Sequence, residues 1–419
     1  MVQAALRSGR ADRHCVFEAF ARRLPDTRRF GVVAGTGRLL DALEDFRFGD
    51  EEIAALKADA VVDDETLEWL RRFEFSGDVD GYREGEVYYP GSPVLTVSGT
   101  FAECVLLETL VLSVLNHDSA VAAAAARMVI AAGDRPLIEM GSRRTHEESA
   151  VASARAAYVA GFASTSNLAA GARYGVPTAG TTAHAFVLLH DDEVEAFRAA
   201  VAAHGPSTTL LVDTYDTREG IRRAVEVAGT GLGAVRIDSG DLAVVAREAR
   251  DLLDSIGAHR TRIVVSGDLD EHAIAALAAA PVDAYGAGTS VVTGSGVPTA
   301  GMVYKLVEVD GRSVAKSSVS KATRGGRKTA LRRHRPSGTS TEEVVASQCV
   351  PESRAGDRAL QVPLVRHGKR VDDGLDLAAA REHHRLARTG VPWSGTSLSR
   401  GEPAIPTTFL ASPSCEEDA

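Results

Sequence analysis

Residues 234–241 read AVRIDSGD, a short apolar run that ends in a cluster of polar and acidic residues. The same theme occurs at 209–216 (TLLVDTYD), 262–268 (RIVVSGD) and 282–290 (VDAYGAGTS), and helix-like amphipathic segments separate the runs. The interval of about 20 to 30 residues is the size of a strand followed by a crossover helix. Such units build a parallel sheet, so we expect an α/β fold with a (β/α) barrel in this part of the chain.

Polar residues stand at the end of each of these runs. In a (β/α) barrel the carboxyl ends of the strands converge on one face, where function gathers. The candidates at these ends are Asp213, Asp238, Asp268 and the pair Gly288-Thr289. Any single cluster could instead be a helix N-cap, because Asp and Ser are favoured there. Four clusters in register favour a shared cavity.

His184 lies in the stretch GTTAHAF at residues 180–186. The small residues before it leave room beside the backbone, and Thr181 and its neighbours offer hydroxyl and N–H groups to an anion. An imidazole changes charge near neutral pH and can act as a nucleophile or proton carrier. The local string alone equally fits a packed or surface histidine, so its function depends on the rest of the sequence.

The segments that flank the barrel segment are rich in strand signals. Residues 86–97 predict a strand, a turn and a strand, and hairpins are expected around 309–311 and 366–368. Residues 101–132 predict a long helical region with a break near 116–119. We therefore expect a second, α+β domain that is assembled from both flanks. The expected boundaries are 1–115 for the N-terminal α+β domain, joined by hairpins from about 302–371, then 116–300 for the catalytic barrel, 301–411 for a C-terminal segment and 412–419 for a disordered tail.

Charge and composition narrow the possible partners. The net charge of −10 argues against broad nucleic-acid binding, because an acidic surface repels phosphate backbones. No run of 18 uncharged apolar residues is present, so no membrane partner is expected. The N-terminus lacks a signal-peptide pattern, which indicates a cytoplasmic protein. The four cysteines stand far apart without paired spacing, so no zinc site is expected.

Lysine is rare in this arginine-rich chain, and its distribution is uneven. Four of the six lysines, at 305, 316, 321 and 328, fall in one short stretch. Lysine serves phosphate as a mobile point charge, whereas arginine offers a fixed fork. The cluster is compatible with a polyphosphate ligand or with a solvated hairpin.

Several short stretches, taken in order from about residue 2 to residue 408, resemble nicotinate phosphoribosyltransferases. Their order and spacing make chance agreement very improbable. The matching stretches are 17–18 with 22–25, the segment 86–97 with 107–109, then 140–144, 164–167, 180–186, 212–216, 236–241, 266–268 and 286–289.

The resemblance implies an irregular (β/α) barrel with a sandwich-like α+β domain, working as a homodimer with shared active sites. The implied reaction joins nicotinate to phosphoribosyl pyrophosphate, giving nicotinate mononucleotide and pyrophosphate for NAD biosynthesis by salvage. Coupling to ATP as co-substrate makes the enzyme a ligase that performs glycosyl transfer, and the family's phosphorylated histidine matches His184. Family members also carry an Asp- and Tyr-containing stretch before the segment matched by residues 1–3. Its aromatic side chain serves the neighbouring subunit's nicotinate site, and we expect a start codon assigned too late.

The candidate residues suit this chemistry. Ribosyl transfer passes through an oxocarbenium-like state that carboxylates stabilise, which fits Asp213 and Asp238 as catalytic residues. Asp238 and Asp268 are candidates for Mg²⁺, and Lys305 and Lys316 for the pyrophosphate. The turn at Gly267 and the helix start at Gly288-Thr289 would hold the 5′-phosphate.

The substrate ring presents a planar carboxylate, for which Arg143 and Arg236 are the expected guanidinium partners. Similar nicotinamide enzymes carry an aspartate at the position of Ser166. That aspartate would repel a carboxylate, so serine favours nicotinate over nicotinamide.

Three alternatives remain at this point. A quinolinate phosphoribosyltransferase would need more cations and no phosphorylated histidine. A barrel aldolase would need a Schiff-base lysine, and residues 130–300 contain no lysine. A ligand-binding relative without turnover is the third, although nothing in the barrel motifs is visibly broken.

Overall fold

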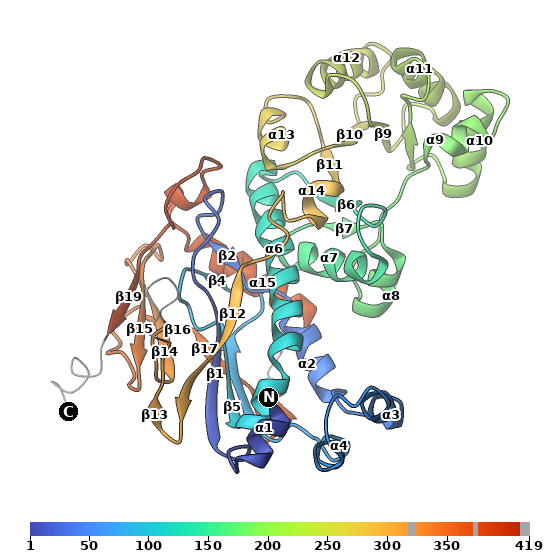
Figure 1. The fold of residues 1–419 in the computed structure, drawn as a ribbon. Coiled ribbons are helices and arrows are strands. Elements are labelled where there is room, and N and C mark those ends of the chain that lie inside the picture. The colour runs from blue at the N-terminus through green and yellow to red at the C-terminus, as the bar shows by residue number, and fades with distance from the viewer. Residues whose placement is uncertain (317–322, 372–375, 411–419) are drawn as a thin grey trace. The chain divides into compact units, whose positions relative to one another are not determined.

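A computed structural model describes residues 1–316, 323–371 and 376–410 (Figure 1). The chain forms two compact units. Unit 1 combines residues 1–120 with the segment from residue 299 onward, and unit 2 consists of residues 121–298. The expected tail at 412–419 lies outside the described residues.

Unit 2 is built on six strands that are all parallel, in the order β7-β6-β11-β10-β9-β8. The expected α/β class and parallel strands are confirmed, and the sheet is an open part of a barrel rather than a closed ring. All four apolar runs form neighbouring strands, because each buries its Val, Ile, Leu and Ala side chains. The strands are β6 (Leu137–Glu139), β7 (Ser164–Thr165), β8 (Thr209–Leu211), β9 (Ala234–Ile237), β10 (Arg262–Gly267) and β11 (Ala284–Ala287).

Helices follow the strands of unit 2, and several begin at an acidic N-cap. Asp216, Asp241 and Asp270 accept backbone N–H bonds at the starts of α11, α12 and α13. The helices are α7 (Glu147–Val159), α8 (Leu168–Tyr174), α9 (His184–Leu188), α10 (Glu193–His204), α11 (Thr217–Ala228), α12 (Leu242–Ser255), α13 (Glu271–Ala276) and α14 (Thr289–Val292).

Unit 1 contains a seven-stranded sheet in the order β13-β12-β1-β5-β3-β17-β18, a four-stranded sheet β16-β14-β15-β19 and the pair β2-β4. Both flanks contribute, since β12 from the C-terminal flank pairs with β1. The strands are β1 (His14–Ala21), β2 (Gly31–Val32), β3 (Asp78–Tyr82), β4 (Val87–Tyr88), β5 (Leu95–Thr100), β12 (Met302–Val309), β13 (Arg312–Ser313), β14 (Lys328–His334), β15 (Ser340–Ser347), β16 (Arg358–Ala359), β17 (Gln361–Arg366), β18 (Lys369–Arg370) and β19 (Thr407–Leu410).

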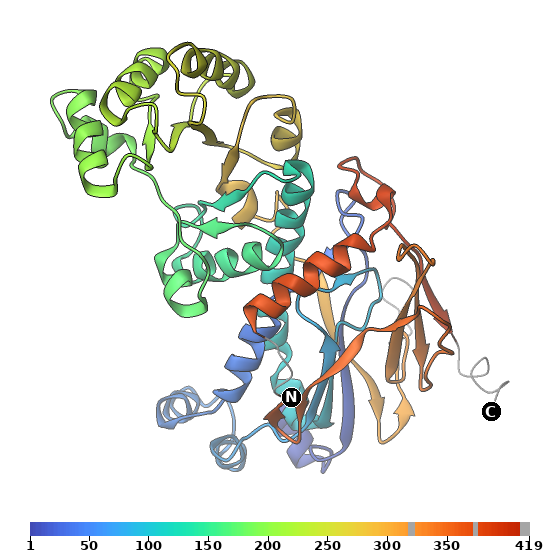
Figure 2. The same ribbon diagram turned by 180° about the vertical axis from the view of Figure 1, so that it is seen from behind.

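The helices of unit 1 lie around these sheets, and Figure 2 shows α15 crossing the unit near β4. The hairpins expected around 309–311 and 366–368 are confirmed as β12-β13 and β17-β18. The helices are α1 (Val2–Arg7), α2 (Thr36–Glu44), α3 (Asp50–Ala58), α4 (Asp64–Arg71), α5 (Phe101–Leu106), α15 (Leu377–Thr389) and the 3₁₀ helix η1 (Trp393–Thr396).

The two strands expected within residues 86–97 are present as β4 and β5, but their expected pairing with each other as a hairpin is wrong. The two strands enter different sheets: β4 pairs with β2, and β5 lies between β1 and β3. Tyr88 packs closely over Gly31, where an added Cβ would meet the ring at 2.1 Å. This contact explains why β4 takes β2 as its partner.

The helix break expected near residues 116–119 is also wrong. A helix end occurs at Leu107 instead, and α6 (Glu108–Ala132) then runs through Asn116 and Asp118 without interruption. The polar side chains have partners outside the helix, since Asn116 bonds to the backbone of Met302 and Asp118 pairs with Arg38.

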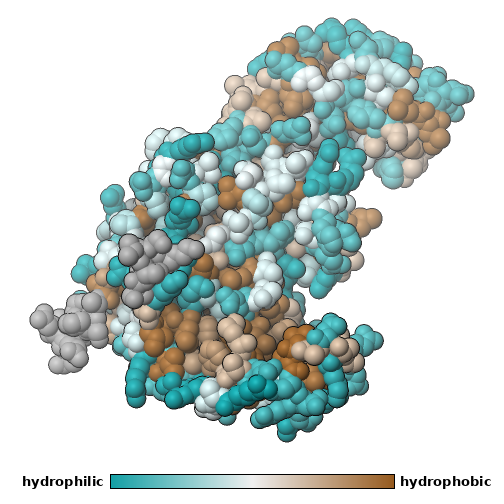
Figure 3. Space-filling model, in the orientation of Figure 1, coloured by the Kyte–Doolittle hydropathy of each residue, from teal (hydrophilic) through white to brown (hydrophobic). Residues whose placement is uncertain are grey.

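By length and composition alone, α6 could cross a membrane. However, 67% of its most apolar window is buried inside the protein, which is the pattern of a core helix. The face of the molecule drawn in Figure 3 shows hydrophobic areas interspersed with many hydrophilic side chains.

Candidate functional site

His184 lies at the start of α9 in unit 2, beside two carboxylates that end neighbouring strands. Its Nε2 is 3.9 Å from Asp213 Oδ1 and 4.0 Å from Asp238 Oδ2, and its Nδ1 is 3.1 Å from Thr214 Oγ1. The imidazole remains about two-fifths exposed, so a ligand can reach it. The structure therefore brings together the three residues expected to be catalytic.

Asp213 is buried and oriented by the next strand end. Its Oδ2 accepts hydrogen bonds from Asp238 N and Ser239 Oγ, both at 2.7 Å. Its Oδ1 has no hydrogen-bond partner and faces His184. An unpartnered buried carboxylate oxygen is costly, which marks a place where a ligand, proton or metal ion would be stabilised.

Arg236 joins the histidine loop to two strand ends. Its Nη1 donates to Thr181 Oγ1 at 2.8 Å, its Nη2 to Asp238 Oδ1 at 2.9 Å and its Nε to Ser266 Oγ at 2.7 Å. Three of its five N–H donors are thus engaged within the site. These bonds orient Thr181, Asp238 and Ser266 relative to one another. The binding of a substrate carboxylate by Arg236 stays a prediction.

Asp238 stays ionised in this setting. Burial raises the pKa of its carboxyl, but hydrogen bonds from Ser266 and Arg236, with the nearby charges, bring it below the ordinary value. A carboxylate kept charged beside an open imidazole can stabilise a developing positive charge.

The expected phosphate loops lie on adjacent strands. Gly267 ends β10 with a φ of 138°, a conformation that favours glycine, and it pairs with Ala287 of β11. Gly288 and Thr289 begin α14, which has no side-chain cap, and both Asp268 and Thr289 are exposed. The two loops can present backbone N–H groups to an anion from neighbouring positions.

Arg143 and Ser166 follow β6 and β7, which also are neighbours in the sheet. Arg143 lies in a turn that Arg144 N closes by donating to Gly141 O, and both Arg143 and Ser166 are exposed. Asn167 Nδ2 donates to Ser142 Oγ at 3.0 Å, which links the two loops. This placement is compatible with both residues facing one ligand.

The lysine cluster belongs to unit 1. Lys305 Nζ donates to Tyr304 O and is 3.8 Å from Glu108 Oε1, and Lys316 is exposed. Lys321 lies outside the described residues. Lys305 and Lys316 thus belong to a different unit from the other candidates, and they contact Tyr304, Glu108 and Thr323 of unit 1.

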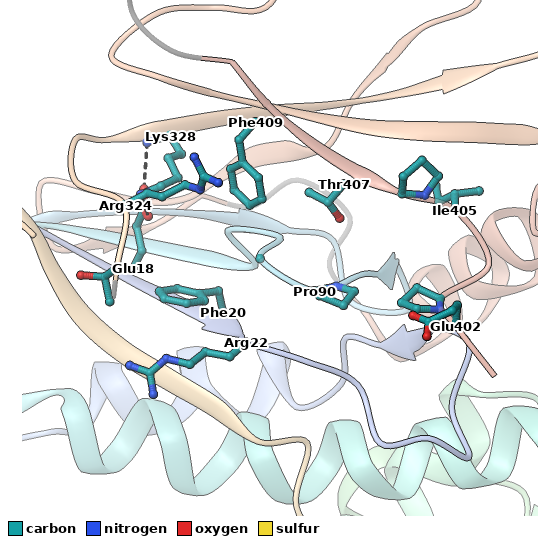
Figure 4. A pocket seen from close by; sticks show the side chains of 14 residues that line it. Glu18, Phe20, Arg22, Pro90, Arg324, Lys328, Glu402, Ile405, Thr407 and Phe409 are labelled. Atoms are coloured by element: carbon teal, nitrogen blue, oxygen red, sulfur yellow. Dashed lines mark hydrogen bonds and ion pairs between the residues drawn. The ribbon is translucent and has the colours of Figure 1, made fainter. Parts of the chain in front are cut away.

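Lys328 is not available as a free cation. Its ammonium donates to Glu18 Oε2 at 2.6 Å, and both side chains are buried at one end of a cavity of about 720 Å³ in unit 1 (Figure 4). Phe20, Arg22 and Phe409 also line this cavity. Lys328 therefore differs from Lys305 and Lys316, the two lysines expected to bind pyrophosphate, because it forms a buried ion pair.

The residues present fit a magnesium ion. Asp213 Oδ1 has no hydrogen-bond partner, and Asp238 Oδ2 is free of the bonds that hold Oδ1. Mg²⁺ is usually held by one or two carboxylates together with phosphate oxygens and water. Among the described residues no group of three or more His, Cys, Asp or Glu forms a ready-made metal cage. An ion here would need substrate oxygens.

Sequence reasoning missed three contributors. Ser266, Thr214 and Ser239 stand in the motifs that were singled out, but their hydroxyls received no function. The signal was their position immediately at or after a strand end. Their partners could be found only in three dimensions, because each lies on another segment of the chain: Thr214 contacts His184, Ser239 contacts Asp213, and Ser266 contacts Arg236 and Asp238.

Comparison with known protein families shows to which class of proteins this chain belongs. Residues 1–116 match the family model of the nicotinate phosphoribosyltransferase N-terminal domain, and residues 121–297 match that of the quinolinate phosphoribosyltransferase C-terminal domain. The parallel α/β unit, with carboxylates at its strand ends, is thus of the phosphoribosyltransferase type.

Whole-chain relatives define the family. A nicotinate phosphoribosyltransferase of Mycobacterium tuberculosis is 62% identical over 419 residues, covering 98% of this chain and 93% of the relative. One from Bacillus subtilis is 38% identical, covering 79% and 71%. The crystal structure of human nicotinic acid phosphoribosyltransferase has a TM-score of 0.83 at 25% identity, covering 99% of this chain and 97% of that chain. The chain belongs to the nicotinate phosphoribosyltransferase family.

Proposed function

We propose that this protein joins nicotinate to phosphoribosyl pyrophosphate and couples the transfer to ATP hydrolysis, forming nicotinate mononucleotide for NAD salvage. The observation that carries the proposal is the cluster of His184, Asp213, Asp238 and Arg236 at adjacent strand ends. Membership of the family supports the choice of substrate.

In the transfer step, the bond from ribose C1′ to the pyrophosphate oxygen breaks and a bond from C1′ to the pyridine nitrogen forms. Positive charge develops on the ribose, as in glycoside cleavage. Asp238, kept ionised by Arg236 and Ser266, is suited to stabilise that charge, with Asp213 behind it. Pyrophosphate leaves with the electron pair of the broken bond.

His184 is proposed to receive a phosphoryl group from ATP. A nitrogen of the imidazole attacks the γ-phosphorus, an N–P bond forms and the bridging P–O bond breaks, releasing ADP; water later releases phosphate. Thr214 fixes the ring through Nδ1 while Nε2 faces the carboxylates. Charge gained and lost here would change how tightly the site holds its ligands.

Arg143 and Ser166 are proposed to recognise the carboxylate of nicotinate. They follow neighbouring strands and belong to linked loops. Arginine offers a bidentate partner, and neutral serine does not repel an anion. Mg²⁺ bound by Asp238 and Asp213 or Asp268 would neutralise pyrophosphate and polarise its leaving oxygen.

The remaining assignments complete the proposal. Gly267, Asp268, Gly288 and Thr289 would hold the ribose and its 5′-phosphate, because their loops offer adjacent backbone donors. Lys305 and Lys316 would serve the pyrophosphate of a shared site in a homodimer. We place this soluble enzyme in the cytoplasm.

A substrate panel tests the proposal. The purified protein is given phosphoribosyl pyrophosphate, Mg²⁺ and ATP with nicotinate, nicotinamide or quinolinate, and mononucleotide formation is followed by chromatography. We expect turnover with nicotinate and at least tenfold lower kcat/KM with the other two acceptors. The variant Ser166→Asp should lower kcat/KM for nicotinate more than Ser166→Ala does, because only the first adds a like charge. Preferred turnover of quinolinate, or none of nicotinate, would overturn the proposal.

A further inference from the structure

Glu139 is a buried carboxylate at the end of β6 that no step above uses. It is 1% exposed and stands beside Thr165 of β7 in the parallel pair β6-β7. Burial raises the pKa of its carboxyl, while bonds from Thr165 and Gly141 oppose that rise. Among the described residues, the side chains and backbone groups that act on this carboxyl are Thr165 and Gly141, and no arginine or lysine pairs with it. Burying an acidic side chain without a cationic partner costs free energy, so such residues are rare in protein interiors. The hydrogen bonds of Glu139 must therefore compensate for its burial.

Its two oxygens connect the two loops that follow β6 and β7. Oε1 accepts a short hydrogen bond from Gly141 N, at the start of the turn that carries Arg143. Oε2 accepts from Thr165 Oγ1 at 2.6 Å, one residue before Ser166. The same carboxylate therefore holds one loop by its backbone and the other by a side chain.

Further bonds extend this connection to Ser166 itself. Ser166 N donates to the carbonyl of Glu139 at 2.8 Å, and Asn167 N donates to Thr165 Oγ1 at 2.9 Å. Thr165 Oγ1 thus accepts from Asn167 N and donates to Glu139 Oε2. In its ionised form the Glu139 carboxylate accepts from both loops, from Gly141 N and from Thr165 Oγ1.

An added Cβ at Gly141 would lie 2.7 Å from Glu139 Oε1 and 2.1 Å from Val292 Cγ1. The turn is thus pressed against the carboxylate and cannot shift toward it. These contacts hold the backbone of the turn that carries Arg143 relative to the loop of Ser166, and a fixed backbone spacing favours recognition of a rigid planar acid.

We propose that Glu139 is a positioning residue that sets the spacing of Arg143 and Ser166, and so determines affinity and selectivity for an aromatic carboxylate. Glu139 does not touch substrate; it acts through Gly141 and Thr165. The inference rests on the proposed function, because it takes Arg143 and Ser166 to be the residues that recognise nicotinate.

The test uses steady-state kinetics of the full-length protein and its variants Glu139→Gln, Thr165→Val and Thr165→Ser. Loss of one buried hydrogen bond is expected to raise KM for nicotinate about tenfold in Glu139→Gln and Thr165→Val. KM for phosphoribosyl pyrophosphate should stay within about twofold, since the Glu139 carboxylate forms its hydrogen bonds with Gly141 and Thr165 and not with Gly267 or Gly288. Thr165→Ser keeps the hydroxyl and should behave like the wild type.

Two further measurements, substrate selectivity and the non-additivity of the double variant, distinguish a positioning role from a general loss of stability. The ratio of kcat/KM for nicotinate to that for nicotinamide should fall in both disruptive variants. The double variant should raise KM little more than either single change, because both break one connection. Glu193→Gln, which changes another buried acid of unit 2, is the matched control and should leave KM for nicotinate unchanged.

Unchanged KM and selectivity in Glu139→Gln and Thr165→Val would overturn the inference. So would an equal fall of all kinetic constants with the melting temperature, or effects that multiply in the double variant. These outcomes require a wild type that converts nicotinate. If the wild type itself does not, the proposed function has failed, and that result is distinct from a failure of the role given to Glu139.

Discussion

Asp213 supports Asp238 in the proposed mechanism and faces His184. Its buried Oδ1 faces His184 Nε2 without a hydrogen-bond donor, while Oδ2 is fixed by Asp238 N and Ser239 Oγ. We expect Asp213→Asn to lower kcat/KM for nicotinate at least about tenfold, because the amide keeps the shape but loses the charge that stabilises positive charge nearby. Initial rates at saturating ATP measure this.

Asp216→Asn is the matched control for that prediction. Asp216 is an exposed N-cap of α11, three residues further along the chain, and asparagine caps helices as well as aspartate does. Both activity and melting temperature should therefore stay near wild type. Equal losses in the two variants would mean that Asp213 has no special place in the site.

At the scale of elements, the close approach of β6 and α14 holds the site together. An added Cβ at Gly141 would meet Val292 Cγ1 at 2.1 Å and Gly288 O at 3.0 Å. We expect Gly141→Ala to destabilise the protein by about 1 to 3 kcal/mol and to raise KM for nicotinate, because the turn with Arg143 must move. Thermal unfolding and steady-state kinetics measure the two effects.

Gly231 provides the comparison for Gly141. An added Cβ there would meet no atom within 4 Å, and its backbone is not left-handed. Gly231→Ala should thus be neutral in both measurements. A neutral Gly141→Ala would contradict the packing described between β6 and α14.

Four of the six strands of unit 2, β8 to β11, could be predicted because each apolar run is short and ends in polar residues, as at Ile237-Asp238 and Leu211-Val212-Asp213. The pairing of β4 and the continuity of α6 could not. The first depends on the contact of Tyr88 with Gly31, and the second on partners that Asn116 and Asp118 find outside the helix. Both are contacts between distant parts of the sequence, which local patterns do not contain.

In the candidate site, too, local patterns predicted some residues, whereas others depended on contacts between distant parts of the sequence. Strand-end residues such as Asp238 were found because topology brings all strand ends to one edge. Whether an aspartate is a cap or a site residue needed the structure: Asp216 and Asp241 cap helices, whereas Asp213 and Asp238 face His184. Glu139 was missed because it carries no motif and its importance lies in two hydrogen bonds.

At the scale of the whole molecule, buried titratable groups set the response to acid. His384 on α15 donates from Nδ1 to Gly85 O, and burial lowers the pKa of its imidazole to about 4. The unfolded chain takes up this proton at its ordinary pKa of 6.5, whereas the folded protein resists until about 4. Stability is therefore lost as pH falls from 6.5 to 4, by roughly 3 kcal/mol from this group.

His384→Asn should remove that part of the acid sensitivity, since asparagine can keep the donor to Gly85 and does not titrate. Urea unfolding followed by tryptophan fluorescence measures it, because both tryptophans, Trp69 and Trp393, belong to unit 1. The difference in unfolding free energy between variant and wild type should shift in favour of the variant on going from pH 7 to pH 4.5. A difference that does not change with pH would refute the account of His384.

The central claim is that His184 couples ATP to ribosyl transfer. The direct measurement is nicotinate mononucleotide formation with and without ATP by the wild type and by His184→Ala, together with phosphate labelling from γ-labelled ATP. For the wild type we predict strong stimulation by ATP and an acid-labile phosphate label on the protein. For His184→Ala we predict basal transfer, no stimulation by ATP and no label. Equal ATP stimulation of the two proteins would contradict the central claim.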